Sequence, residues 1–250
     1  YICKNIKSQS KYKLVGEINS IDNSIISIPK TVSIKILSKN DNNGNLIKIS
    51  IPHIKKDLPI FLILYALGFT NNEDIIYTIL PDKKVPNYNN FLQFLKPSIE
   101  EVSNIDNNDA LEIISKSINI TSYTKELLDN NNNIDIIKII LQKEFLPHIG
   151  VNPIKKKFFL CSMIYKLLLV YYNYETYDDR DSYMNKRIST PGILLANLFR
   201  QYYIKLIKDI KKNIIKEFNN GSWKAVNDIT NIVTNININK IIKSNTLTTG

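Results

Sequence analysis

The residues best suited to chemistry lie in one charged loop, which reads Asp178-Asp179-Arg180-Asp181-Ser182-Tyr183-Met184-Asn185-Lys186-Arg187. Its three aspartates are oxygen donors of the kind that Mg²⁺ prefers, so the loop could hold a catalytic metal ion. Its three cations lie among and beside those aspartates and would pair with the same carboxylates, at about 0.2–1 kcal/mol for each exposed pair. We favour an internally paired structural loop, and a metal site is the alternative.

The other residues of chemical interest are scattered. Cys3 and Cys161 are far apart in sequence, and neither they nor the two histidines, His53 and His148, have metal-ligand or disulfide-framework spacing. This pattern predicts a reducing compartment and no zinc site. His148 could be a catalytic base, but a helix-end histidine bonded to a carbonyl is the interpretation we favour. The seven glycines form no phosphate-binding loop.

The net charge of +10 would suit a polyanionic partner such as nucleic acid. The chain is also rich in Asn, Ile and Lys together, the residues of A/T-rich codons, so genome composition contributes to the lysine excess. Lys205, Lys208, Lys212 and Lys216 are spaced to form one stripe of a helix. A solvated face is the interpretation we favour for this stripe, and phosphate contact is the alternative.

Short strands and then helices must position these groups. Residues 13–18, 32–36 and 46–51 alternate apolar and polar side chains, which predicts a small antiparallel sheet with a turn at 40–45. Helical patterns follow over residues 60–67, 70–79, from 90 past Pro97, 106–117, 134–146, 153–172 and 191–218. Thr70 and Glu73 have capping-box spacing, and Pro97 should split or kink its helix. The longest apolar run, 158–172, is too short to span a membrane and contains Lys166, which predicts a core helix.

Blocks along nearly the whole chain resemble the second-largest subunit of multisubunit DNA-directed RNA polymerases, the counterpart of the bacterial β subunit. The most specific block is Asp178-Asp179-Arg180-Asp181 followed by Asn185-Lys186-Arg187. The blocks occupy residues 51–60, 66–68, 95–100, 141–149, 157–160, 163, 167–168, 178–181, 185–187, 191–195 and 198–199. They occur in the order that the family has, and we expect a eukaryote-like member.

The resemblance implies an α+β fragment, mostly helical with small antiparallel sheets, in which a lobe domain is inserted into a protrusion domain. Residues 1–34 would be the first part of the protrusion, 35–177 the lobe, and 178–250 the second, truncated part of the protrusion. Asp178, Asp179 and Arg180 would then belong to a structural junction between the two domains. We also expect the protein to continue past Gly250.

By the same resemblance, the fragment is part of a nucleotidyltransferase but lacks its catalytic site, and the Mg²⁺ ions of the whole enzyme bind elsewhere. It would form one wall of the DNA cleft and a docking surface for initiation factors. The partners implied are the other polymerase subunits, chiefly the largest, together with DNA and initiation factors, and no membrane. The location implied is intracellular, in the nucleus, or in the virion or host cytoplasm for a virus.

In bacterial relatives the corresponding loop is close to the downstream non-template DNA strand, with an acidic residue at the position of Asp181 and an arginine at that of Lys186. The resemblance therefore implies nucleic-acid proximity for Asp181, Lys186 and Arg187. Lysine keeps the charge but loses the bidentate fork of arginine, so phosphate contact is expected before base readout. Two alternatives are a stand-alone, non-enzymatic helical nucleic-acid-binding protein and a Mg²⁺ nuclease that uses the aspartates.

Overall fold

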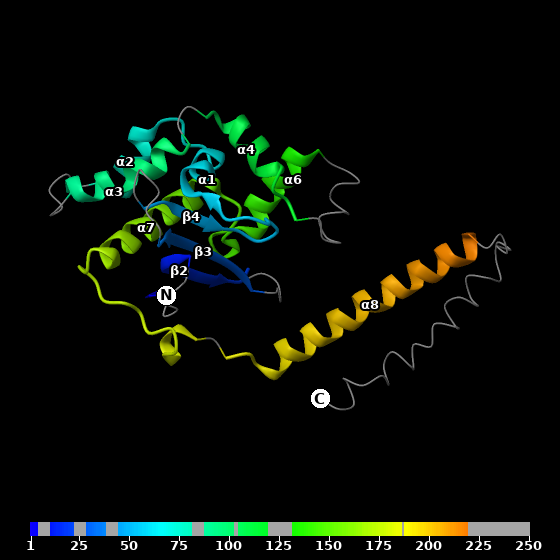
Figure 1. Ribbon diagram of the computed structural model, residues 1–250. Coiled ribbons are helices and arrows are strands. Elements are labelled where there is room, and N and C mark those ends of the chain that lie inside the picture. Colours follow the sequence, from blue (N-terminus) through cyan, green and yellow to red (C-terminus); the bar gives the residue numbers. More distant parts are fainter. Residues whose placement is uncertain are drawn as a thin grey trace. The chain divides into compact units, whose positions relative to one another are not determined.

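The computed structural model describes residues 1–4, 11–22, 29–38, 45–81, 88–102, 105–119, 132–186 and 188–219 (Figure 1). Two compact units divide the chain, Tyr1–Lys186 and Arg187–Gly250. Helices predominate in the described part, and the strands there form one antiparallel sheet. This arrangement confirms the predicted α+β class.

The sheet of the first unit has the order β1-β2-β3-β4-β5, with every neighbouring pair antiparallel. Its strands are β1 (Ile2–Lys4), β2 (Tyr12–Ser20), β3 (Lys30–Leu37), β4 (Ile47–Ser50) and β5 (Leu58–Pro59). Burial follows the predicted period of two. Ile34 and Ile36 of β3 and Ile47 and Ile49 of β4 are buried, and the residue after each of them is only partly buried. The predicted turn at 40–45 lies mainly outside the described residues.

Helices pack around this sheet to complete one hydrophobic core (Figure 1). They are α1 (Ile60–Ala66), α2 (Asn72–Ile79), α3 (Tyr88–Glu100), α4 (Asn107–Ser115), α6 (Asn133–Ile139) and α7 (Pro153–Tyr171). The apolar run that we predicted to be a core helix is most of α7, which packs against β2 and α2. No helix among the described residues is long and apolar enough to cross a membrane.

Helix ends differ from prediction in two places. Helix α2 is capped by Asn71 rather than Thr70, and neither side chain closes the capping box that we expected with Glu73. Pro97 does not split its helix, because α3 continues through it to Glu100. Pro97 is buried, so packing offsets the hydrogen bond that a proline removes from a helix interior. Gly68 follows the end of α1, at a φ of 97° that glycine adopts without strain.

The helix predicted over 134–146 is α-helical in its first half and π-helical in its second. After α6, residues Ile140–Glu144 form a π-helical turn (η1), in which the amide of Phe145 donates to the carbonyl of Ile140 at 2.9 Å. The side chain of Lys156, which is fully buried, reaches this turn from α7. Its ammonium donates to the carbonyl oxygens of Leu141, Gln142 and Phe145 at 2.9, 2.7 and 2.5 Å. Lys156 therefore satisfies the carbonyls that the end of the helix leaves unpaired.

A second polar cluster ties the π-helical turn to the sheet. Glu144 contacts Lys30 at the start of β3 and lies 3.5 Å from Nε2 of His53. The interaction with His53, followed by that with Lys30, lowers the pKa of Glu144 to about 2. His53 has a φ of 64°, a left-handed conformation that is uncommon for a residue other than glycine. The cluster therefore fixes the 51–57 connection beside the helix end.

The second unit is described through α8 (Pro191–Asn219), whose start at Pro191 matches the helix predicted over 191–218. The amide of Leu194 donates to the carbonyl of Thr190 at 3.1 Å. The four lysines of the predicted stripe are exposed on this helix, and so are apolar residues such as Leu195 and Phe199.

The proposed division into 1–34, 35–177 and 178–250 stays a prediction. The boundary at 34/35 lies inside β3, whose residues on both sides pair with β2.

Candidate nucleic-acid interface at the charged loop

The charged loop begins with a residue that is fastened to the edge of the sheet. The amide of Asp178 donates to the carbonyl of Ile2 at 2.9 Å, and its carboxylate Oδ2 accepts from the amide of Ile2 at 2.8 Å. Ile2 belongs to the edge strand β1, and its neighbour Tyr1 exchanges both backbone hydrogen bonds with Glu17 of β2. The backbone N–H and C=O groups of successive residues in an edge strand point to opposite sides. Those of Tyr1 point toward β2, so those of Ile2 point away from it. Asp178 thus supplies the partner that a further strand would have supplied.

The shape of the loop comes from hydrogen bonds to Asp179. Its Oδ1 accepts from the amide of Asp181 at 2.9 Å, and its carbonyl accepts from the side-chain amide of Asn185 at 2.8 Å and from the amide of Ser182 at 3.3 Å. These bonds enclose the short 3-10 turn η3 (Tyr183–Asn185). Asp and Asn side chains commonly close turns in this way, so the loop needs no glycine.

The ion pairs that we expected are present at Asp181 but are weak. Its Oδ1 lies 3.7 Å from Nε of Arg180 and 3.7 Å from Nζ of Lys186. The Asp181 side chain is 72% exposed, and both cations are more than half exposed. Exposed pairs at this distance contribute little to stability, so they set the local charge rather than the fold. Arg187 lies outside the described residues.

The positive charge of Arg180 reaches the edge of the sheet. Burial is the main cause that raises the pKa of Tyr1 to about 12 and that raises the pKa of the Cys3 thiol. The guanidinium of Arg180 acts against both shifts, because it favours the anionic forms. Asp178 and Arg180 are therefore both close to β1.

The aspartates do not converge on a metal position. Asp178 holds the edge strand, Asp179 holds the turn, and Asp181 faces two cations. Among the described residues, no three His, Cys, Asp or Glu side chains are grouped as a metal site would require. The loop does not fit the Mg²⁺ ligand set that we considered as its alternative.

Sequence reasoning missed two side chains at the tip of the loop. Tyr183 is 89% exposed and Met184 is 91% exposed, although both are large and apolar. The sequence did contain a signal for their exposure: both residues stand in a charged segment, after three aspartates and before Lys186, with no other apolar residue among them. An exposed aromatic ring beside exposed cations can stack on a base while the cations contact phosphates.

The other candidates from the sequence do not join this loop into one site. His148 lies edge-on to Phe159 at 5.2 Å, and burial together with the charge of Lys156 lowers its pKa. Cys161 is a buried core residue, and burial raises its pKa to about 12. The lysine stripe of α8 belongs to the second unit.

Comparison with known proteins gives one consistent result. The family described as RNA polymerase Rpb2, domain 2, matches residues 2–189. The chain is 32% identical to DNA-directed RNA polymerase II subunit 2 of Arabidopsis thaliana over 258 aligned residues, covering 100% of the chain and 20% of the relative. It is 35% identical to subunit RPB2 of the Schizosaccharomyces pombe enzyme, covering 87% of the chain and 18% of the relative.

A viral protein is similar to the same degree. DNA-directed RNA polymerase subunit 2 of Acanthamoeba polyphaga mimivirus is 34% identical over 227 residues, covering 83% of the chain and 18% of the relative. The chain thus spans about a fifth of the length of the curated relatives that it matches.

Proposed function

The chain belongs to the family of RNA polymerase Rpb2, domain 2, and we propose that it serves as one wall of the DNA cleft in a multisubunit DNA-directed RNA polymerase. The observation that carries this proposal is the family match over residues 2–189, which includes the described charged loop. Its relatives are named as second subunits of such polymerases in plants, fungi and a large virus.

The charged loop would be the part of this wall that meets nucleic acid. The carboxylate of Asp178 accepts a hydrogen bond from the edge strand, and that of Asp179 accepts one from the turn. Together they hold the loop in place. Lys186 and Tyr183 are exposed beyond them. Lysine is a compact charge without a planar fork, so phosphate contact suits Lys186 better than base readout. Asp181 would limit this contact to one side of the lysine, since it lies 3.7 Å from its Nζ.

Catalysis would take place elsewhere in the assembly. The described carboxylates of the loop are engaged separately, so we derive no metal-dependent step from them. The nucleotidyl-transfer site and its Mg²⁺ would belong to other parts of the enzyme, chiefly the largest subunit. Initiation factors would dock on the outer surface of the same wall. Transcription would take place in the nucleus or, for a virus, in the virion or host cytoplasm.

A stand-alone nucleic-acid-binding protein is the competing function. It would explain the charge of +10, but it does not account for a family match along three quarters of the chain's residues or for relatives that are all polymerase subunits by name. The polymerase function is therefore the one that we propose.

Crosslinking tests the role of the loop. A photoreactive amino acid replaces Tyr183 in the assembled polymerase, and the enzyme is irradiated on an open promoter template. We expect a crosslink to DNA from position 183 and none from position 77, where Tyr77 is also exposed, at 67%. Equal crosslinking from the two positions, or crosslinks only to protein from position 183, would contradict a cleft-facing loop.

A further inference from the structure

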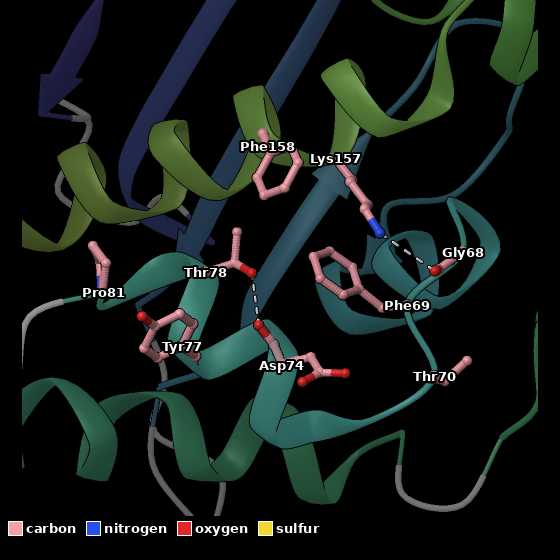
Figure 2. Close-up of a pocket in the computed structure, with 9 residues that line it drawn as sticks. All are labelled: Gly68, Phe69, Thr70, Asp74, Tyr77, Thr78, Pro81, Lys157 and Phe158. Carbon is pink, nitrogen blue, oxygen red and sulfur yellow. Dashed lines mark hydrogen bonds between the residues drawn. The ribbon is translucent and has the colours of Figure 1, made fainter.

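A groove opens on the first unit between α2 and the start of α7, away from the charged loop in sequence (Figure 2). Its volume is about 620 Å³, within the range of roughly 300–1,000 Å³ typical of ligand-binding clefts. Nine residues line it: Gly68, Phe69, Thr70, Asp74, Tyr77, Thr78, Pro81, Lys157 and Phe158.

The groove exposes aromatic surface that the core does not use. Phe158 is 53% exposed and Tyr77 is 67% exposed, on opposite walls, while Phe69, which lies near Lys157 at the Gly68 end of the groove, is buried (Figure 2). Single exposed apolar residues are ordinary, but a group of them around a concavity marks a binding surface. Aromatic anchors are typical of the centres of such surfaces.

The ammonium group of Lys157 lies at the wall of the groove and has hydrogen-bond donors available for a ligand. Nζ of Lys157 lies 4.3 Å from the ring centroid of Phe69 and 5.9 Å from that of Phe158. Its one hydrogen bond given by the structure is a long one, 3.5 Å to the carbonyl of Gly68. An ammonium has three donors. Lys157 forms no ion pair with a carboxylate in the described part of the chain.

The groove carries one opposing charge, at Asp74 on the α2 wall. The carbonyl of Asp74 accepts from the hydroxyl of Thr78 at 2.7 Å, so that residue's backbone is already engaged within α2. The α7 wall bears Lys157, and α7 has no acidic residue in its first turn. An occupant must therefore place its negative charge along α7 and its apolar side chains between the two walls.

We propose that this groove binds a short acidic peptide segment of a partner protein, with an aromatic or large aliphatic side chain seated between Tyr77 and Phe158. A carboxylate of the segment pairs with Lys157. This proposal extends the proposed docking of initiation factors. It rests on the proposed function only for the statement that the partner is a transcription factor. The net charge of +10 of the chain attracts such a segment at long range.

Fluorescence anisotropy of the full chain with labelled peptides tests this. The probe is a fluorescein-labelled peptide in which phenylalanine and leucine alternate with glutamates. One control peptide has lysines for the glutamates, and another has serines for the apolar residues. We expect saturable binding of the probe and at least about tenfold weaker binding of each control, since a lost anchor or a lost charge pair is worth at least one factor of ten in affinity.

Variants locate the binding. Lys157→Glu and Phe158→Ser should each weaken the probe about tenfold, whereas Asp74→Asn should strengthen it by about two- to threefold because it removes the opposing charge. Lys166→Glu is the matched control: Lys166 is exposed on the same helix, nine residues away, and its variant should bind as the unmodified chain does. Circular dichroism checks that each variant is folded.

Three results would overturn the proposal: no binding, equal loss in Lys157→Glu and Lys166→Glu, or displacement of the probe by a short DNA duplex. The first two leave the DNA contacts of the charged loop untouched, because neither of those measurements includes DNA. Failure of the crosslink from position 183 leaves the peptide assay untouched in turn.

Discussion

Replacing Asp178 should release the charged loop from the sheet, whereas replacing Asp181 should not. Both changes to alanine remove one carboxylate from the same loop. The Asp178 carboxylate accepts a 2.8 Å hydrogen bond from the amide of the buried Ile2. Hydrogen bonds to charged groups contribute about 1.5–3 kcal/mol. Among the described residues, Asp181 forms two exposed ion pairs at 3.7 Å, which together contribute about 0.5 kcal/mol or less.

Hydrogen exchange at the amide of Ile2 reports this difference directly. A loss of about 2 kcal/mol in Asp178→Ala corresponds to about thirtyfold faster exchange, since every 1.4 kcal/mol is a factor of ten. Asp181→Ala should change that rate less than about twofold. Limited proteolysis between residues 173 and 190 should follow the same order.

Equal exchange in the two variants would refute this account of the loop. So would unchanged exchange in Asp178→Ala, since the geometry leaves the Ile2 amide without that acceptor. Asp178→Asn is the conservative variant: its amide oxygen can still accept, so it should retain most of the protection.

Three further changes test the packing and the surface. Glu144→Gln should lower the free energy of unfolding by about 2 kcal/mol at neutral pH, and because His53 helps to lower the pKa of Glu144 to about 2, this loss should be full above pH 4.5 and fade toward pH 2 in denaturant titrations. Lys156→Ala should cost about 3 kcal/mol by urea unfolding, because it empties a fully buried site and strands three carbonyls, whereas Lys166→Ala, on the same helix and exposed, should cost less than about 0.5 kcal/mol. Lys186→Glu should weaken binding of the full chain to a labelled single-stranded DNA several-fold and flatten its salt dependence, and an unchanged salt slope would argue against phosphate contact.

Much of the fold could be predicted because its signals are local. The alternation in residues 32–36 predicted β3, and the helical pattern over residues 191–218 predicted α8. The capping box at Thr70 was wrong because a one-residue shift of the helix start removes its geometry. Pro97 stays inside α3 because tertiary packing outweighs a local preference, and no local pattern contains that packing.

The candidate site could be predicted in composition but not in detail. The sequence indicated a paired, structural charged loop, and its resemblance indicated the family. It could not show that Asp178 bonds to Ile2, because that contact joins residues 176 positions apart. Nor could it show the groove, since Tyr77 and Phe158 come from separate helices that only the fold brings together. Lys156 likewise reads as one of three consecutive lysines, and only the fold buries it.

The most direct test of the central claim is purification of the tagged protein from its native source, followed by an assay for RNA synthesis on a DNA template. The polymerase account predicts that the protein is recovered in equal amount with a largest subunit, and that the complex incorporates nucleotides only when DNA is present. Recovery of the protein alone, binding DNA but synthesising no RNA, would contradict that account and favour the stand-alone nucleic-acid-binding protein.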